Sequence, residues 1–129
     1  MCGKPVGIYK GVRPDVCEEC RDKLVYINDD RCFKCGKQLE DTESEYCYDC
    51  RRMQHVFDRG AAAFAYSEGI KQSVYRYKYK GCREYAKWYA AQIKERCGFM
   101  LDEWSPEVIV PVPLHIMKLR ARGYNQAEL

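Results

Sequence analysis

The sequence has no long apolar run, no bias toward the residues of disordered chains and no strong excess of one charge. No apolar stretch approaches the roughly 18–20 residues needed to span a bilayer, and the N-terminus lacks the basic start and apolar core of a signal peptide. Only 5 of the 129 residues are proline, and Ser and Gln are not enriched, which argues against disorder. We therefore expect a folded cytoplasmic protein with no membrane span.

Cysteine is abundant, and its arrangement is the most informative feature of the sequence. Nine cysteines are a high number for the cytosol, where thiols stay reduced and disulfides are rare. Six of them form three pairs with two residues between the partners: Cys17 and Cys20, Cys32 and Cys35, Cys47 and Cys50. The other three stand alone: Cys2, Cys82 and Cys97. Paired cysteines in a reducing compartment predict metal binding.

The second and third pairs predict one structural zinc site. Zinc prefers four soft donors in a tetrahedron, and two cysteines separated by two residues supply two donors from one tight turn. Eleven residues separate the two pairs, and Gly36 directly after the second cysteine relieves the turn. A rubredoxin-like iron site, a redox dithiol and disulfides are the alternatives, although a thioredoxin-type pair would occur once rather than three times. The candidate zinc ligands are Cys32, Cys35, Cys47 and Cys50.

The first half of the sequence contains two copies of one module. Residues 2–4 (Cys-Gly-Lys) followed by the pair at 17 and 20 match residues 35–37 (Cys-Gly-Lys) followed by the pair at 47 and 50. This repeat favours sequential pairing of the cysteines. The alternative is a cross-braced arrangement, in which the pair at 17 and 20 joins the pair at 32 and 35.

The first copy predicts a second, incomplete metal site. In the first copy the counterpart of Cys32 would fall just before Met1, so only three thiols are available: Cys2, Cys17 and Cys20. Either the start has been placed too late, or water or another donor fills the fourth position. His55 is one candidate donor, although a solvated surface histidine is the simpler interpretation.

Beyond the cysteine pairs, the pattern indicates a second domain that begins near residue 57. Residues 61–66 are expected to be extended, and two amphipathic helices separated by Gly81 are expected to follow. We expect Gly98 to end the second helix. The isolated Cys82 and Cys97 have no partners at ligand spacing and are expected to be small apolar core residues.

The last part of the sequence predicts an α/β domain that is cut short. Residues 108–110 (Val-Ile-Val) suit a strand buried on both faces of a parallel sheet. Residues 125–128 (Asn-Gln-Ala-Glu) form a capping-box pattern that opens a helix. A helix that starts at the last residues, with no later strand to pair with, indicates truncation.

Two basic segments are candidate binding sites for phosphates or nucleic acid. Residues 75–80 alternate aromatic and basic side chains, a pattern that could stack bases and neutralise phosphates of a single strand, or could form a helix face with solvated cations. Residues 1–56 carry 10 Lys and Arg against 11 Asp and Glu, and residues 57–129 carry 12 against 8. The second half is therefore the expected location of any nucleic-acid site.

A second basic segment follows the expected strand. Ligands bind at the carboxyl end of strands in open α/β sheets, and cations near a helix start suit phosphate. A basic surface loop is the alternative. The candidate phosphate-binding residues are Pro111, Val112, Pro113, Leu114, His115, Lys118, Arg120 and Arg122.

Three segments together resemble the ComF family, bacterial competence-associated proteins that are similar to phosphoribosyltransferases. Residues 108–129 (V-I-V-P-V-P-L-H-x-x-K-L-R-x-R-G-Y-N-Q-A-E-L) are similar to the family's signature segment, residues 78–81 include a K-Y-K-G motif, and the paired cysteines resemble its double zinc ribbon. The resemblance implies a type I phosphoribosyltransferase fold in which residues 111–115 face the pyrophosphate of phosphoribosyl pyrophosphate (PRPP). Ile116 stands where the family usually has proline.

The resemblance also implies what this chain does not include. The family's acidic strand-loop with a Thr-Thr-Gly turn, which binds the ribose phosphate near Mg²⁺, is not in the sequence. We therefore expect a double zinc ribbon in residues 1–56, the incomplete start of an α/β phosphoribosyltransferase-like domain in residues 57–129, and no transferase activity from the chain as given. The implied partners are the DNA-uptake machinery and single-stranded DNA. The alternatives are a zinc ribbon that binds nucleic acid or a protein, and a fragment of an active phosphoribosyltransferase.

Overall fold

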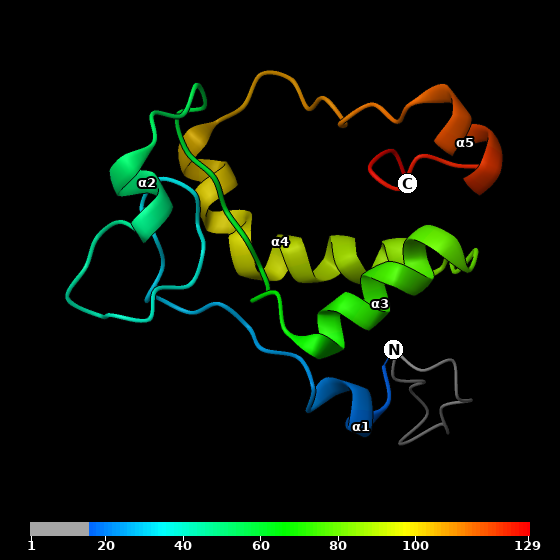
Figure 1. Ribbon diagram of the computed structural model, residues 1–129, viewed down its shortest axis with the longest axis horizontal. Helices are drawn as coiled ribbons and strands as arrows, with labels where there is room; N and C mark the ends of the chain where they lie inside the picture. Colours follow the sequence, from blue (N-terminus) through cyan, green and yellow to red (C-terminus); the bar gives the residue numbers. More distant parts are fainter. Residues whose placement is uncertain (1–15) are drawn as a thin grey trace.

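The computed structural model describes residues 16–129, in which five helices are joined by irregular segments. The helices are α1 (Glu18–Arg21), α2 (Tyr48–Arg52), α3 (Glu68–Tyr79), α4 (Tyr85–Trp104) and α5 (Ile116–Arg122). Figure 1 shows α3 and α4 side by side, with α2 at one end of the molecule and α5 with the C-terminus at the other. Cys2 lies outside the described residues.

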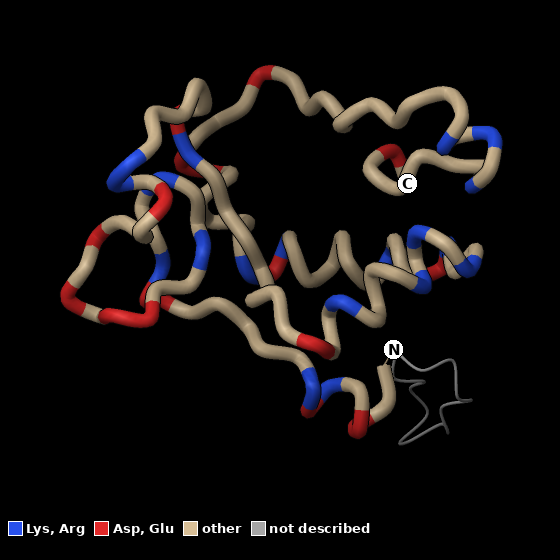
Figure 2. The backbone as a smooth tube through the Cα atoms, in the orientation of Figure 1, with Lys and Arg blue, Asp and Glu red and all other residues tan. Residues whose placement is uncertain are grey.

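Charge is distributed unevenly over this arrangement. In Figure 2, Lys and Arg gather where α5 lies near the junction of α3 and α4, whereas Asp and Glu gather in the loop that precedes α2. Among the helices of residues 16–129, none combines the length and the apolar character that crossing a membrane requires.

The expected pair of helices around Gly81 is confirmed. Gly81 adopts a φ of +69°, a left-handed conformation that ends α3 and allows the chain to turn into α4. The two helices pack through buried residues that include Ile70 and Tyr77. Ser73 is fully buried between them, and its hydroxyl lies 2.6 Å from the hydroxyl of Tyr89. This hydrogen bond satisfies a polar group that would otherwise be costly to bury.

The prediction that Gly98 ends the second helix is wrong. α4 continues to Trp104 and ends at Ser105, which adopts a left-handed φ of 45°. A glycine inside a helix costs about 1 kcal/mol relative to alanine. On either side of it, Cys97 and Met100 are buried, so packing of the helix outweighs this local preference.

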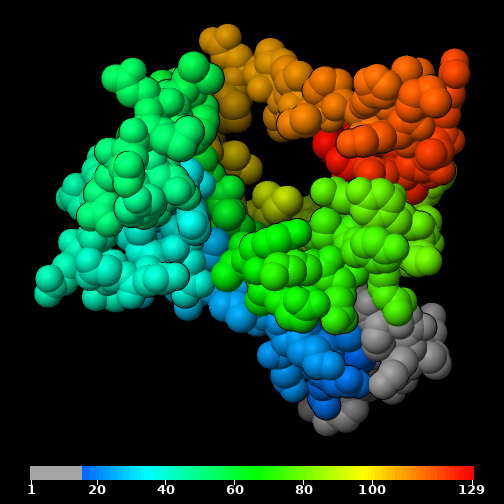
Figure 3. All heavy atoms as spheres, in the orientation of Figure 1, coloured from blue at the N-terminus to red at the C-terminus, as the bar shows by residue number. Residues whose placement is uncertain are grey.

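The prediction of a buried strand at residues 108–110 is also wrong. Within residues 16–129 the only β pairings are two isolated bridges, Tyr26 with Phe64 and Arg31 with Gln38. Residues 108–110 take part in neither bridge, and the side chain of Ile109 is 87% exposed. Figure 3 shows why: the stretch after α4 crosses an open space on its way to α5, so no neighbouring strand lies beside it. A strand needs such a partner for its backbone hydrogen bonds.

The extended conformation expected for residues 61–66 is consistent with the backbone hydrogen bonds of this segment. The amide of Ile27 donates to the carbonyl of Ala63 at 3.2 Å, and the amide of Ala65 donates to the carbonyl of Val25 at 2.9 Å. The pairing places Phe64 with its ring 5.0 Å from that of Tyr26.

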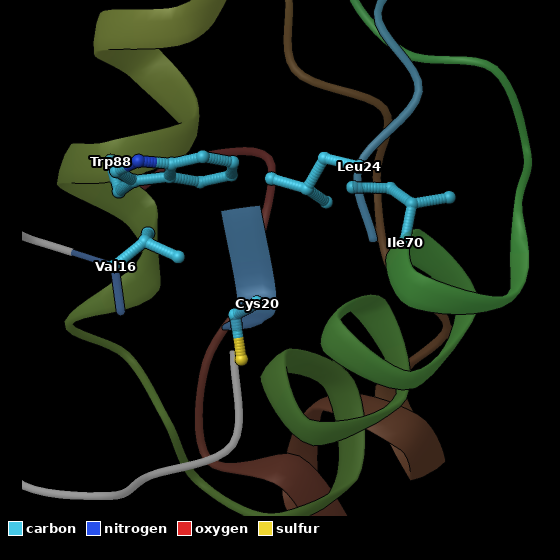
Figure 4. Close-up of a cluster of buried hydrophobic side chains, with 5 residues drawn as sticks. All are labelled: Val16, Cys20, Leu24, Ile70 and Trp88. Carbon is cyan, nitrogen blue, oxygen red and sulfur yellow. The ribbon is translucent and has the colours of Figure 1, made fainter. Parts of the chain in front are cut away.

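One hydrophobic cluster joins the N-terminal segment to the helical pair. Its buried members, drawn in Figure 4, are Val16, Cys20, Leu24, Ile70 and Trp88. The ring of Phe64 stacks on Trp88 at 5.4 Å and extends the cluster toward residues 25–27. Burial of a large apolar side chain contributes about 1.5–3 kcal/mol, so this cluster explains how a helix as short as α1 is stable.

The capping-box pattern at residues 125–128 forms a hydrogen-bonded turn, and the helix start that it predicted is not observed. The side-chain oxygen of Asn125 accepts from the amide of Ala127 at 3.1 Å, and its amide nitrogen donates to Glu128 at 2.8 Å. The same nitrogen donates to the carbonyl of Val112 at 3.1 Å. Buried Asn125 therefore anchors the segment before α5 to the segment after it.

Two glycines provide a matched test of this packing. We expect Gly98→Ala to raise the free energy of unfolding by about 0.5–1 kcal/mol, since nothing lies within 4 Å of the added methyl group. We expect Gly69→Ala to lower it by about 1–3 kcal/mol, because a Cβ there would lie 2.4 Å from the carbonyl oxygen of Lys23. Urea unfolding of both variants measures the difference, and equal effects would contradict the close approach of α3 to residue 23.

Candidate metal centre

Four thiols from two separate turns converge at one point. The Sγ atoms of the second and third cysteine pairs all lie within 4.8 Å of one another: Cys32, Cys35, Cys47 and Cys50. The sulfurs of Cys35 and Cys47 are 3.8 Å apart, which matches the roughly 3.8 Å edge of a tetrahedron with metal–sulfur distances of about 2.3 Å. The geometry and the donor set therefore fit tetrahedral zinc.

The first turn is a tight knuckle that only glycine can close. The amide of Gly36 donates to the carbonyl of Cys32, and the amide of Cys32 donates to the carbonyl of Lys37, both at 2.8 Å. Gly36 has a φ of +72°, and a Cβ there would lie 2.7 Å from the carbonyl oxygen of Gly60. The sequence pattern of cysteine followed by glycine thus has a direct structural cause.

The second turn presents its thiols from the start of α2. Cys47 is the N-cap of α2 and Cys50 lies within it. The amide of Arg51 donates to the carbonyl of Cys47 at 3.1 Å, which closes this turn. The amide of Phe33 donates to the carbonyl of Glu45 at 3.0 Å and links the two turns directly.

The four thiols differ in how readily they ionise. Burial raises the pKa of Cys32, but hydrogen bonds from the backbone at Cys47, Cys35 and Lys34 outweigh it and lower that pKa to about 6. Burial also raises the pKa of Cys35. The pKa of Cys50 is raised by burial and, in addition, by its hydrogen bonds to the other three thiols. Four thiolates cannot share this small volume without a cation to offset their charge, which is the role a metal ion fills.

The first cysteine module has the same local geometry as the second. Cys17 caps α1 with φ −68° and ψ 156°, and Cys47 caps α2 with φ −69° and ψ 163°. The carbonyl of Cys17 accepts from the amide of Arg21 at 3.0 Å, as that of Cys47 does from Arg51. Cys20 is buried in the hydrophobic cluster. This similarity supports the two-copy interpretation of the sequence.

His55 lies beside the four-cysteine cluster, a position that the sequence did not predict. Its Nε2 is 3.4 Å from the sulfur of Cys50, and its ring stacks on Phe57 with centroids 4.9 Å apart. An N–H donated to a thiolate stabilises the negative sulfur. The spacing of five residues from Cys50 to His55 is the only signal in the sequence that points to this contact.

Of the isolated cysteines, the two that the structure describes, Cys82 and Cys97, take no part in the cluster. Cys97 is buried in α4, as expected for a small apolar core residue, and burial raises its pKa. Cys82 is half-buried, and its thiol lies 3.8 Å from the carbonyl oxygen of Lys80.

The structure separates the candidate phosphate-binding residues into two groups. Residues 111–115 are extended and largely exposed, and His115 caps α5 by accepting from the amide of Met117 at 3.3 Å. Lys118 and Arg122 belong to α5 and line a cleft between this helix and the end of α3. Residues 111–115 do not line that cleft, and neither does Arg120, which is exposed on α5.

Comparison with known proteins identifies the class of this site. Residues 1–51 match the double zinc ribbon domain family. The chain is also 26% identical over 126 residues to "Competence protein ComFC" of Bacillus subtilis (strain 168), an alignment that covers 92% of this chain and 51% of that protein. No solved structure matches the chain.

The double zinc ribbon and the four-cysteine cluster define a zinc-binding ribbon protein. The ribbon match and the similarity to ComFC both agree with the resemblance to the ComF family that the sequence motifs carry. The chain spans about half the length of this curated relative.

Substitution of one cluster cysteine tests the metal centre. We expect Cys47→Ser to lower the zinc content by one ion per chain and to unfold the ribbon, because so small a module has little core of its own. Cys82→Ser removes a half-buried thiol outside the cluster and serves as the control. Metal analysis and circular dichroism measure both effects. Full zinc content with native folding in Cys47→Ser would contradict the assignment, as would more iron than zinc in the purified wild type.

Proposed function

We propose that this chain is a zinc-stapled competence protein of the ComF type, which contacts single-stranded DNA during uptake through the exposed face of α3. The name of the similar protein, "Competence protein ComFC", supports the biological setting. The observation that carries the molecular part is a groove along α3 in which exposed tyrosines alternate with cations.

The proposed metal ligands are the four clustered cysteines and the three of the first module. One Zn²⁺ is held by Cys32, Cys35, Cys47 and Cys50, whose sulfurs all lie within 4.8 Å of one another. A second, weaker Zn²⁺ is held by Cys2, Cys17 and Cys20. The matching backbone conformations at Cys17 and Cys47 support this second site. The first ion serves structure, because all four of its ligands are cysteines.

The groove on α3 has the features of a stacking surface. Tyr75 and Tyr79 are exposed one helical turn apart, with ring centroids 5.2 Å apart and planes tilted by 44°. Tyr66 is also exposed at the start of α3, and the Nζ of Lys71 lies 5.4 Å from the centre of its ring. The groove has a volume of about 880 Å³. Exposed aromatic rings in a row accept bases from a single strand without regard to sequence.

The distribution of charge favours nucleic-acid binding at the groove on α3 and disfavours it at the zinc ribbon. Four cations line the groove, Lys71, Arg76, Lys78 and Lys80, against one carboxylate, Glu68. The ribbon instead carries the acidic loop that precedes α2 (Figure 2), and its zinc thiolates add further negative charge. Phosphates of a nucleic acid are therefore attracted to α3 and repelled from the ribbon.

Phosphoribosyl transfer is not proposed for these residues. Transfer requires one element to hold the pyrophosphate while a second element and Mg²⁺ hold the ribose phosphate. The first element corresponds to residues 111–115, and the sequence contains no Thr-Thr-Gly loop for the second. Binding of PRPP and Mg²⁺ belongs to a full-length relative in this proposal.

Two exposed tyrosines on different helices test the stacking surface. We expect the zinc-loaded chain to bind labelled oligothymidylate, and Tyr75→Ala to weaken binding about tenfold, since stacking of one base on an aromatic ring contributes about 1–3 kcal/mol. Tyr48→Ala is the matched control, because Tyr48 is similarly exposed but lies on α2. Fluorescence anisotropy measures the affinities. No binding by the wild type, or equal loss in both variants, would contradict the proposal.

A further inference from the structure

A second cleft lies between the end of α3 and α5. It has a volume of about 380 Å³ and is lined by Lys78, Tyr79, Gly81, Lys118, Ala121 and Arg122. In Figure 3, α5 and the C-terminal residues lie against the end of α3. The two walls of the cleft are thus about 40 residues apart in the sequence, and the cleft exists only in the folded chain.

The cleft is cationic, and no described residue that lines it carries a negative charge. Three of its six lining residues are cations, and none is acidic. Among residues 16–129, no carboxylate forms an ion pair with Lys78, Lys118 or Arg122. Cations elsewhere in the molecule do form such pairs; Arg59 lies 2.9 Å from Glu103, for example. An anion in the cleft would therefore find three unneutralised positive charges.

One of these cations is held in place before any ligand arrives. The guanidinium of Arg122 donates to the side-chain oxygen of Gln126 and lies 5.3 Å from the centre of the Tyr79 ring. Gln126 is itself held in place, because its backbone carbonyl accepts a hydrogen bond from the hydroxyl of Tyr77 at 2.8 Å. An arginine that is already oriented loses little entropy when it binds, and its other N–H groups remain available to an oxyanion.

We propose that this cleft binds a phosphate group through Lys78, Lys118 and Arg122. The tetrahedral oxyanion accepts hydrogen bonds from the ammonium group of Lys78 on the α3 side, and from the ammonium group of Lys118 and the guanidinium of Arg122 on the α5 side. The phosphate has two sources, a nucleic-acid backbone or a free phosphate ion. The first source rests on the proposed function, because Lys78 and Tyr79 also line the groove on α3, so that a strand stacked there would pass its backbone to the cleft.

Titration of the zinc-loaded full chain with inorganic phosphate tests the site without nucleic acid. We expect saturable NMR shifts of the Gly81 and Ala121 amides at low salt, with half-saturation on the order of millimolar, as for exposed cation–anion contacts. The double variant Lys78→Ala/Lys118→Ala should bind phosphate at least about fivefold more weakly. The control Lys87→Ala/Lys94→Ala removes the same charge from the exposed face of α4 and should leave binding unchanged. Circular dichroism checks that each variant is folded.

Oligothymidylate distinguishes the two sources of the phosphate. If the backbone supplies it, the slope of log affinity against log salt should fall by about 1.4 in the Lys78/Lys118 variant, since each single-strand phosphate contact contributes about 0.7. An unchanged slope with weakened phosphate binding assigns the site to free phosphate. The proposal fails if the Gly81 and Ala121 amides do not shift, or if the α4 control loses phosphate binding as strongly. Loss of oligothymidylate binding in Tyr75→Ala, with phosphate binding intact, bears only on the stacking surface.

Discussion

The convergence of four thiols is the interaction on which the N-terminal part of this molecule depends. Between residues 28 and 60, all of which the structure describes, the buried apolar side chains are those of Cys32 and Cys47. A segment of this length with two buried side chains does not gain enough from hydrophobic burial to offset its loss of conformational entropy. Zinc supplies the missing free energy, because binding to a site that exists only when folded is itself folding free energy.

The zinc ribbon in turn positions the helical half of the chain. The knuckle at Gly36 packs directly on Gly60 and Ala61. The next few residues pair with residues 25–27, and Phe64 then stacks on Trp88 of α4. A continuous series of contacts thus runs from the metal site to the helices that carry the groove and the cleft. This arrangement explains how a structural metal can support the proposed binding surface although the metal site contributes no residue to it.

The sequence predicted those features that depend on local chemistry. Cysteine spacing and Gly36 identified the four-thiol cluster, because a tight turn constrains both residue type and distance. Gly81 identified a helix end for the same reason, whereas the pattern at Asn125 gives a hydrogen-bonded turn and not the helix start that it predicted. Recurrence of the cysteine pairs identified the shared backbone conformation at Cys17 and Cys47.

Features that depend on distant parts of the chain were missed. Gly98 did not end α4, because packing of Cys97 and Met100 outweighs the cost of glycine. Residues 108–110 form no strand, because a strand needs a neighbour that the pattern of one segment cannot reveal. The contact of His55 with Cys50 likewise arises only when the chain folds. The same holds for the cleft in which Lys78 of α3 faces residues of α5.

Hydrogen exchange with and without zinc tests most directly whether the metal organises the ribbon. The relevant amides are those of Cys32, Phe33, Gly36 and Gly60, each of which donates to a backbone carbonyl in or beside the two turns. We predict that removal of zinc under reducing conditions raises their exchange to nearly the unfolded rate, while amides of α3 and α4 retain most of their protection. Unchanged protection of these four amides without zinc would show that packing alone holds the ribbon, and would contradict the account.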